Sequence, residues 1–191
     1  MPSEIMLLAA GKSIRTPVPK GLIPHQGKLW ITHQVEQLLK VGNVHVVLGF
    51  HADKYQDALS CLPCSIHVNP APERGPFSSL QTALVHCTRS VFVLPLDTPC
   101  PPLLLWEQLE RALGDRKVSI PEFAGRGGHP VLLSKTFQED LLSVDPNCVF
   151  ARLDLQIRKL PRHQTARVSA GGSEILENLN FDKDFDQYFQ K

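Results

Sequence analysis

The chain alternates short, strongly apolar runs with segments whose apolar residues follow helical spacing. Apolar runs occupy residues 5–10, 44–48 and 91–94, and the apolar positions between 31 and 39 recur at i, i+4, i+7 and i+8. Runs of this kind are typical of strands covered on both faces, and repeated strand–helix units require a mostly parallel sheet. We therefore predict an α/β fold, a three-layer α/β/α sandwich with a Rossmann-like sheet.

The remaining pattern completes this prediction. Helices are expected over 51–59, 78–86, 103–113, 135–143 and 147–160 and after Asp182, and short strands over 65–68, 166–168 and 174–177. The apolar runs 118–123 and 130–133 flank the glycine-rich segment 124–128, which predicts an irregular antiparallel β-hairpin. The 191 residues contain no linker long enough to divide them, so one domain spanning 1–191 is expected.

Charge and cysteine content narrow the class of protein. The formal net charge is +1 and no basic patch is evident, so no nucleic-acid partner is expected. The apolar stretches are too short to cross a bilayer, and no basic segment precedes the first one, so neither a membrane span nor a signal peptide is expected. Five cysteines, an odd number, favour free thiols in the cytoplasm; we interpret Cys61 and Cys64 as incidental rather than as half of a zinc or redox site.

A loop suited to phosphate follows the first strand. It carries Gly11, Ser13, Arg15 and Lys20, so exposed backbone N–H groups and two cations could face phosphate oxygens. The spacing matches neither the P-loop nor the dinucleotide-binding glycine pattern. A basic surface turn explains the loop equally well at this point.

A second candidate group lies beyond the run 91–94. Asp97 would stand at the carboxyl end of a strand, where ligands bind in such sheets, and a carboxylate there is a natural Mg²⁺ ligand. The alternative is that Asp97 caps the turn at 99–103. We prefer the metal role because of its position in the crevice.

Four segments together resemble a known family. They are Leu8-Ala-Ala-Gly-Lys-Ser-Ile-Arg15 with Lys20, the segment from Asn69 to Leu80, Pro95-Leu-Asp97-Thr-Pro, and Gly128-His-Pro130; the segment 177–184 is similar to the family's terminal element. In this order they resemble the MobA-like NTP transferases, the molybdenum-cofactor nucleotidyltransferases, over nearly the whole chain. The resemblance implies an enzyme that moves an NMP from an NTP to a phosphorylated acceptor, with Mg²⁺ as cofactor.

The resemblance also implies roles for individual residues. Lys20, Asp97 and Arg15 would be catalytic, with Asp97 and Asn180 as metal ligands and His129 toward the acceptor. The nucleotide would contact Leu8, Ala9, Ala10, Gly11, Ser13, Arg15, Lys20, Gly75 and Ser79.

Departures from the family pattern leave alternatives open. Pro17 removes a backbone donor from the loop, and the terminal element reads Asn180-Phe-Asp-Lys-Asp184. Molybdopterin is the first acceptor expected, with a sugar 1-phosphate or another small phosphate next, and CTP is placed ahead of GTP. A nucleotide-binding module without catalysis is the alternative from another class.

Overall fold

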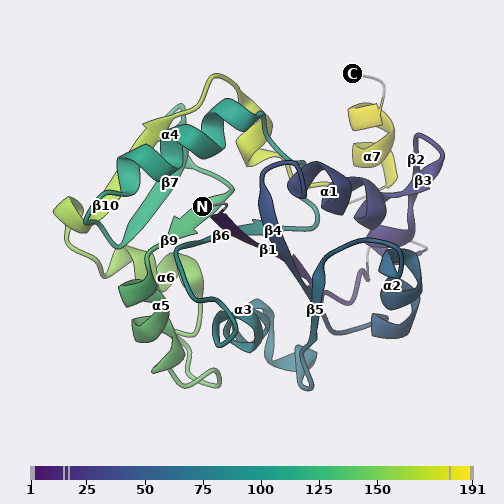
Figure 1. Ribbon diagram of the computed structural model, residues 1–191, viewed down its shortest axis with the longest axis horizontal. Helices are drawn as coiled ribbons and strands as arrows, with labels where there is room; N and C mark the ends of the chain where they lie inside the picture. The colour runs from purple at the N-terminus through teal and green to yellow at the C-terminus, as the bar shows by residue number, and fades with distance from the viewer. Residues whose placement is uncertain (1–2, 15, 17, 181, 190–191) are drawn as a thin grey trace.

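A mixed, mostly parallel sheet crosses the computed structural model, which describes residues 3–14, 16, 18–180 and 182–189 (Figure 1). Its strand order is β10-β7-β9-β6-β1-β4-β5, with β8 paired to β7. The strands are β1 (Ser3–Ala9), β4 (Gly42–Leu48), β5 (Ser65–Val68), β6 (Val91–Pro95), β7 (Val118–Phe123), β8 (Arg126–Gly127), β9 (Val131–Leu133) and β10 (Thr165–Ser169). A small antiparallel sheet joins β2 (Pro24–His25) to β3 (Lys28–Leu29).

The pairing confirms the predicted sheet and its antiparallel element. Strand β1 runs parallel to β4 and β6, β4 to β5, and β7 to β10. Strand β9 lies antiparallel between β6 and β7, and β8 folds back on β7. The hairpin therefore forms in an irregular way, because β9 is inserted between two strands that precede it in the chain.

Helices cover both faces of the sheet (Figure 1). One face carries α1 (Trp30–Leu38), α2 (Ala52–Leu59), α4 (Leu103–Leu113) and α7 (Asp182–Phe189), and the other carries α3 (Pro76–Leu84), α5 (Lys135–Leu142) and α6 (Leu153–Arg158). Four short 3₁₀ segments connect them: η1 (Lys20–Leu22), η2 (Pro72–Arg74), η3 (Arg162–Gln164) and η4 (Ser173–Leu176). No helix in the described part of the chain combines the length and apolar composition that a bilayer span needs.

Alternation along the strands builds a separate core on each face. In β1, Ile5 and Leu7 join the cluster under α1 and α4, whereas Met6 joins the cluster under α3 and α5. Phe92 and Val93 of β6 divide in the same way. Successive side chains of a strand point to opposite faces, so strands of this apolar composition are stable only between two helical layers.

Two element predictions are wrong. The helix expected over 147–160 is limited to α6, because residues 145–151 form turns: the Asp145 carboxylate accepts from the Asn147 backbone N–H at 2.9 Å, and the Cys148 N–H donates to the Asp145 carbonyl. Such local bonds compete with helix formation. The strand expected over 174–177 is instead the 3₁₀ segment η4, whose Ile175 carbonyl accepts from the His129 backbone N–H at 3.0 Å.

Strand order determines where a ligand can bind. From β1 the chain first adds β4 and β5 on one side and then β6 on the other. The connections at the carboxyl ends of these strands therefore diverge around β1, which opens a crevice at the switch point of the sheet.

Candidate active site

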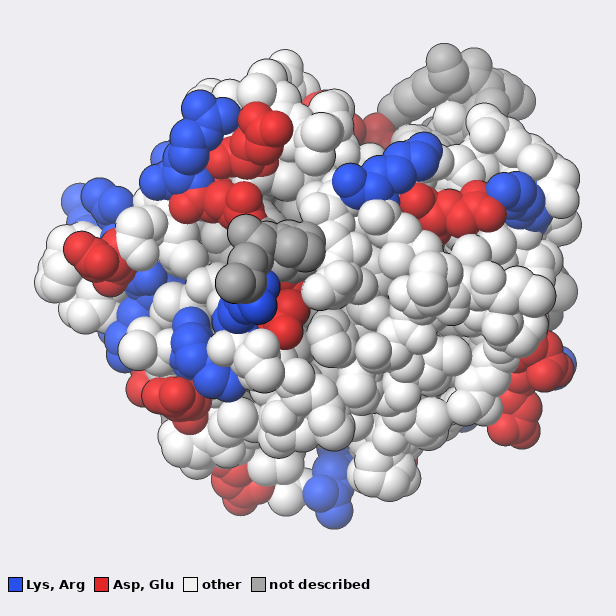
Figure 2. Space-filling model, viewed as in Figure 1, with Lys and Arg blue, Asp and Glu red and all other residues white. Residues whose placement is uncertain are grey.

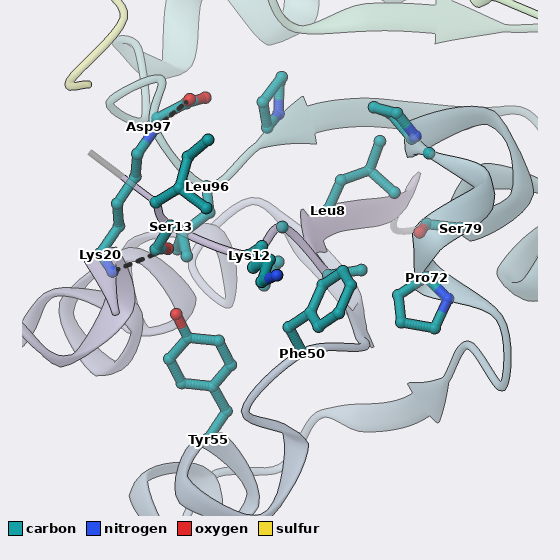
Figure 3. Close-up of a pocket in the computed structure, with 17 residues that line it drawn as sticks. Leu8, Lys12, Ser13, Lys20, Phe50, Tyr55, Pro72, Ser79, Leu96 and Asp97 are labelled. Atoms are coloured by element: carbon teal, nitrogen blue, oxygen red, sulfur yellow. Dashed lines mark hydrogen bonds and ion pairs between the residues drawn. The ribbon is translucent and has the colours of Figure 1, made fainter. Parts of the chain in front are cut away.

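A cavity of about 570 Å³ occupies this switch point (Figure 3). Its walls come from the segments that follow β1, β4, β5 and β6. Nine residues predicted from the sequence line it: Leu8, Ala9, Ala10, Gly11, Ser13, Lys20, Gly75, Ser79 and Asp97. The structure therefore brings the cationic loop and the acidic strand end into one crevice.

Backbone bonds hold the end of β1 between its neighbours. The Leu8 carbonyl accepts from the Leu96 N–H at 3.0 Å, and the Ala10 carbonyl accepts from the Phe50 N–H at 3.3 Å. At Gly49, a Cβ atom would stand 2.9 Å from the Ala10 carbonyl oxygen, so this approach requires glycine. The loop that begins at Gly11 is thus tied to both flanking strands.

Ser13 and Tyr55 fix the path of the loop. Ser13 has a left-handed backbone (φ 53°), and its Oγ accepts from the Lys20 N–H at 3.1 Å. The buried Tyr55 hydroxyl accepts from the Gly21 N–H at 3.2 Å and points toward Ser13 in Figure 3. Burial raises the pKa of Tyr55, so the hydroxyl stays protonated near neutral pH.

The Lys20 ammonium joins two oxygens from distant parts of the chain. Its Nζ lies 2.9 Å from Asp97 Oδ2 and 2.8 Å from Asn180 Oδ1. The Lys20 side chain is 13% exposed and that of Asp97 22%, so the pair is only partly screened by solvent. The Asp97 carboxylate bonds Lys20 rather than capping the turn at 99–103, and α4 begins after Pro102 without a side-chain cap.

The C-terminal segment carries Asn180 to this place. The Leu179 N–H donates to the Asp97 carbonyl at 2.8 Å, and the Asn180 N–H donates to Asp184 Oδ2 at 2.9 Å. Leu179 is buried at the base of the segment. These contacts set the amide oxygen of Asn180 beside the carboxylate of Asp97.

The wall opposite the loop is built by the segment between β5 and α3. Gly75 has φ +91° and ψ −176°, a region open essentially only to glycine. The buried Asn69 amide donates to Ser78 Oγ at 2.9 Å and to Ser79 Oγ at 3.0 Å. These bonds fix the start of α3, where Ser79 faces the cavity in Figure 3.

His129 lies in a second cavity, of about 720 Å³, which shares Leu8, Pro76 and Pro95 with the first. Burial lowers the pKa of His129, and this effect is opposed by a hydrogen bond to the Val93 backbone and by the charge of Asp97. Its ring is therefore neutral near pH 7. Among the residues that the structure describes, none hydrogen-bonds its buried Nδ1.

The structure thus brings most of the predicted site residues together, with two exceptions. Arg15 lies outside the described residues. Asn180 reaches the site through Lys20 and does not line either cavity. Sequence reasoning missed Phe50 and Tyr55, which also line the first cavity. Other lining residues lie within the segments that carry the resemblance but had no assigned role: Lys12, Ile14, Pro72, Pro76, Pro95 and Leu96. Phe50 could have been found, because it follows a strand that pairs with β1; Tyr55 carries no signal of its own.

The oxygens of Asp97 and Asn180 could hold a divalent cation such as Mg²⁺. Both converge on one cation, the Lys20 ammonium, and carboxylate and amide oxygens are hard ligands of the type Mg²⁺ takes. The described residues include no group of three or more His, Cys, Asp or Glu side chains that could hold a metal. Mg²⁺ commonly binds through one or two carboxylates with waters and substrate phosphates, so a small protein ligand set is sufficient.

The chain is similar to known proteins in sequence and in fold. The family model described as MobA-like NTP transferase domain matches residues 5–166. A probable molybdenum cofactor guanylyltransferase of Rhodopirellula baltica is 31% identical over 97 residues, which cover 49% of this chain and 46% of the relative. The match thus spans about half the length of that curated relative.

Two solved structures share the fold. A nucleotidyl transferase from Methanothermobacter has a TM-score of 0.80 at 20% identity, over 99% of this chain and 96% of its own. A Mycobacterium tuberculosis protein in complex with manganese has a TM-score of 0.78 at 17% identity, over all of both chains. At these identities the likeness establishes the fold alone.

Proposed function

Because this chain belongs to the MobA-like NTP transferase domain family, we propose that it transfers a nucleoside monophosphate from an NTP to a phosphorylated acceptor. Pyrophosphate is the second product. One observation carries the proposal: Lys20, Asp97 and Asn180, from three distant parts of the sequence, meet within hydrogen-bond distance at the mouth of a nucleotide-sized cavity.

The first cavity would hold the triphosphate. Open space lies beside Gly11 in its wall, since a Cβ built at this residue would meet nothing within 4 Å. The Lys20 ammonium supplies a compact charge for the α-phosphoryl oxygens, and Ser13 holds the Lys20 backbone in place. Preorganised cations of this kind stabilise the charge that develops on transferring phosphoryl groups.

Asp97 and Asn180 would hold Mg²⁺, as the convergence of their oxygens suggests. Bound there, the ion would neutralise phosphate charge and orient the triphosphate. A manganese complex of a protein with this fold supports a divalent ion. The ammonium of Lys20 would then turn from these oxygens toward the nucleotide.

In the reaction an oxygen of the acceptor phosphate attacks the α-phosphorus, and the bond from that phosphorus to the bridging oxygen of the leaving pyrophosphate breaks. The electron pair of that bond leaves with pyrophosphate. A phosphate monoester is already ionised near neutral pH, so no strong general base is required. The neutral His129 accordingly lies on the acceptor side without an assigned proton-transfer role.

For the substrates, we propose molybdopterin as acceptor and GTP or CTP as donor. The Rhodopirellula relative, named as a guanylyltransferase, supports GTP and the molybdenum cofactor. The Gly128-His-Pro130 element, by resemblance, supports CTP. A sugar 1-phosphate is the second acceptor candidate, and a nucleotide-binding module without catalysis is the second functional class.

The test is pyrophosphate release by the purified protein with each of the four NTPs, Mg²⁺ and molybdopterin. We expect pyrophosphate release with either GTP or CTP. In Asp97→Ala the rate of release should fall about 10²–10³-fold, the effect of removing one preorganised charge contact. Asp115→Ala, at an exposed position, is the matched control. Near-normal turnover in Asp97→Ala would overturn the assignment of the site.

Thermal shift separates the two functional classes. A ligand that binds the folded state raises the melting temperature. A base-selective shift with Mg²⁺ and NTP, without turnover on any acceptor, would favour the binding module. If no NTP raised the melting temperature, the first cavity would not be a nucleotide site.

A further inference from the structure

The first cavity is charged on one side and apolar on the other. Asp97, which pairs with Lys20, follows β6, whereas Phe50 follows β4 and Pro72 follows β5. Because the sheet order is β6-β1-β4-β5, these two groups lie on opposite sides of the end of β1, as the close-up in Figure 3 shows. The cavity therefore orients an elongated ligand, with its anionic tail at Lys20 and its flat, less polar head at Phe50.

Phe50 presents its ring to the apolar side of this cavity. Pro72 packs against the neighbouring Gly49, where a Cβ atom would stand 2.7 Å from the Pro72 Cβ, so the wall beside the ring is tightly built. The Phe50 ring is half-buried, whereas Tyr55, the other aromatic residue in the described lining, is buried. Phe50 is thus the aromatic residue with a face that a ligand can reach.

Lys12 places a cation over the face of this ring. Its Nζ lies 5.8 Å from the centroid of the Phe50 ring, within the range of a cation–π interaction. The Lys12 carbonyl oxygen lies 3.3 Å from His51 Nε2, so the segment after β4 also holds the backbone of the lysine. The Lys12 residue is exposed, and its flexible side chain lets the ammonium leave the ring while the backbone stays in place.

Selection among the four NTPs has to come from contacts with the base, because the triphosphate is common to all of them. Surface charge does not distinguish them either: Figure 2 shows basic and acidic side chains interleaved on the face that it presents, and the formal net charge is +1. The ring of Phe50 and the ammonium above it are therefore the features of the cavity that bear on base choice.

The ring face that holds the ammonium also suits a nucleobase. Bases stack on aromatic side chains, and a purine covers more of a ring than a pyrimidine does. A base stacked on Phe50 would bring its edge within reach of the Lys12 ammonium, which donates three hydrogen bonds and accepts none. The ammonium therefore favours a base edge with acceptors: O6 and N7 of guanine over the N6 amino group of adenine, and O4 of uracil over the N4 amino group of cytosine.

From these observations we propose that Phe50 and Lys12 select the base of the donor, and that this base is guanine. Stacking on Phe50 favours purines, and the Lys12 ammonium, displaced from the ring, favours a keto edge. Guanine combines both features and cytosine has neither. The inference rests on the proposed function, in which this cavity holds the NTP, and it decides between the two donors named there.

The test measures the dissociation constants of GTP, ATP, UTP and CTP with Mg²⁺ by calorimetry, with inorganic tripolyphosphate as the probe that lacks a base. The wild-type protein should bind GTP about tenfold more tightly than UTP or ATP, the worth of one stacking or hydrogen-bond contact, and CTP most weakly of the four NTPs. Phe50→Leu should lose the difference between GTP and UTP, and Phe50→Tyr should retain it. Lys12→Met should lose the difference between GTP and ATP.

Phe150 and Lys159 supply the matched controls. Lys159 Nζ lies 4.8 Å from the centroid of the Phe150 ring, a contact of the same kind, and neither residue belongs to the described lining of the two cavities. Phe150→Leu and Lys159→Met should leave all four dissociation constants unchanged.

The inference is overturned if the wild-type protein binds the four NTPs equally, prefers a pyrimidine, or binds no NTP more tightly than tripolyphosphate. A GTP/UTP difference that survives in Phe50→Leu, or a GTP/ATP difference that survives in Lys12→Met, would overturn the role of that residue. Pyrophosphate release separates this inference from the proposed function. Guanine-selective binding without release on any acceptor loses the transferase proposal alone, whereas release with all four NTPs alike loses only the base selection.

Discussion

Lys20 has two partners in this structure that it would have to leave during nucleotide binding. Its ammonium satisfies both Asp97 and Asn180, at 2.9 and 2.8 Å. In the proposed reaction the same two oxygens bind a divalent ion. The lysine therefore competes with the metal before the nucleotide arrives, and the triphosphate gives the ammonium another anion.

Lys20→Ala should separate these two effects. Turnover should fall about 10²–10³-fold, because a charge on the α-phosphoryl oxygens is lost. Binding of Mn²⁺ without nucleotide, measured by electron paramagnetic resonance, should tighten, because Asp97 is no longer paired. Lys28→Ala, which removes an exposed partner of Glu36, should change neither quantity. Weaker Mn²⁺ binding in Lys20→Ala would contradict this interpretation of the pair.

Tyr55→Phe tests how the loop is positioned. The change keeps the buried ring but removes the oxygen that accepts from the Gly21 N–H, which leaves this buried N–H without its partner at a cost of about 1–3 kcal/mol. We expect a lower melting temperature and a KM for NTP raised about tenfold. Ser13→Ala should raise the KM similarly, and the double variant should do so less than additively, because Ser13 and Tyr55 accept from the consecutive N–H groups of Lys20 and Gly21. Full additivity would show that Tyr55 acts on stability alone.

At the residue scale, the sequence pointed to the motif residues of the candidate site but not to the residues that hold them in position. The loop and Asp97 are recognisable because each follows a predicted strand, whereas Asn180 was named only through the family resemblance. Tyr55 is a buried tyrosine on an ordinary amphipathic helix, and nothing in its neighbours distinguishes it from a core residue. Its role comes only from long-range packing against Gly21, whose Cβ would stand 2.8 Å from the ring.

At the element scale, three histidines from separate elements form a stack beside the sheet. His45 of β4 lies with Nδ1 3.0 Å from Nε2 of His67 in β5, and the ring of His67 stacks on His86, after α3, at 4.4 Å between centroids. Burial, and then the charges of His86 and His45, lower the pKa of His67 to about 4. Burial also lowers the pKa of His45, which the charge of Glu4 on β1 opposes.

This stack should make stability depend on pH. An unfolded histidine titrates near 6.5 and folded His67 near 4, so the unfolded state binds more protons between these values. Stability should therefore fall as the pH falls from 6.5 to 4, by about 1–2 kcal/mol from this residue after allowance for solvent screening. Denaturant unfolding of His67→Asn should show a smaller slope over this range, and the exposed His163→Asn an unchanged one. An unchanged slope in His67→Asn would contradict the assignment.

The elements themselves were predictable wherever periodicity was long and clear. Strand β5 and helix α4 have the expected bounds, and β1, β4 and β6 differ by a residue or two. The failures at 147–152 and 174–177 lie where side-chain bonds of Asp145 and tertiary contacts of Ile175 outweigh local preference. Nor could periodicity place β9 between β6 and β7, because strand order depends on pairing between distant segments.

At the scale of the whole molecule, the two ends of the chain complete the site together. Helix α7 packs on α1, with Trp30 and Phe185 edge-to-face at 5.7 Å between centroids. Phe185 is 1% exposed. The C-terminal segment is therefore held by this aromatic contact together with the backbone bond of Leu179 to Asp97, and Asn180 depends on that segment for its position.

Phe185→Ala should loosen this segment. Truncating a buried phenylalanine costs about 3–5 kcal/mol where the surroundings cannot collapse. We expect faster hydrogen exchange over 177–189 with β1 still protected, and a higher KM for Mg²⁺. Leu103→Ala, at a side chain 55% exposed on α4, is the control. Uniformly faster exchange, in β1 as well, would show that α7 does not open independently.

The insertion of β1 at the middle of the sheet has a consequence for how such a chain can diversify. Strands β4 and β5, with the wall formed between β5 and α3, come from the first eighty residues, whereas β6, β7, β9 and β10 come from residues 91–169. Under the proposed function, donor choice and acceptor choice are then encoded in consecutive stretches of the gene. A single crossover between relatives near residue 85 would exchange one specificity and keep the other.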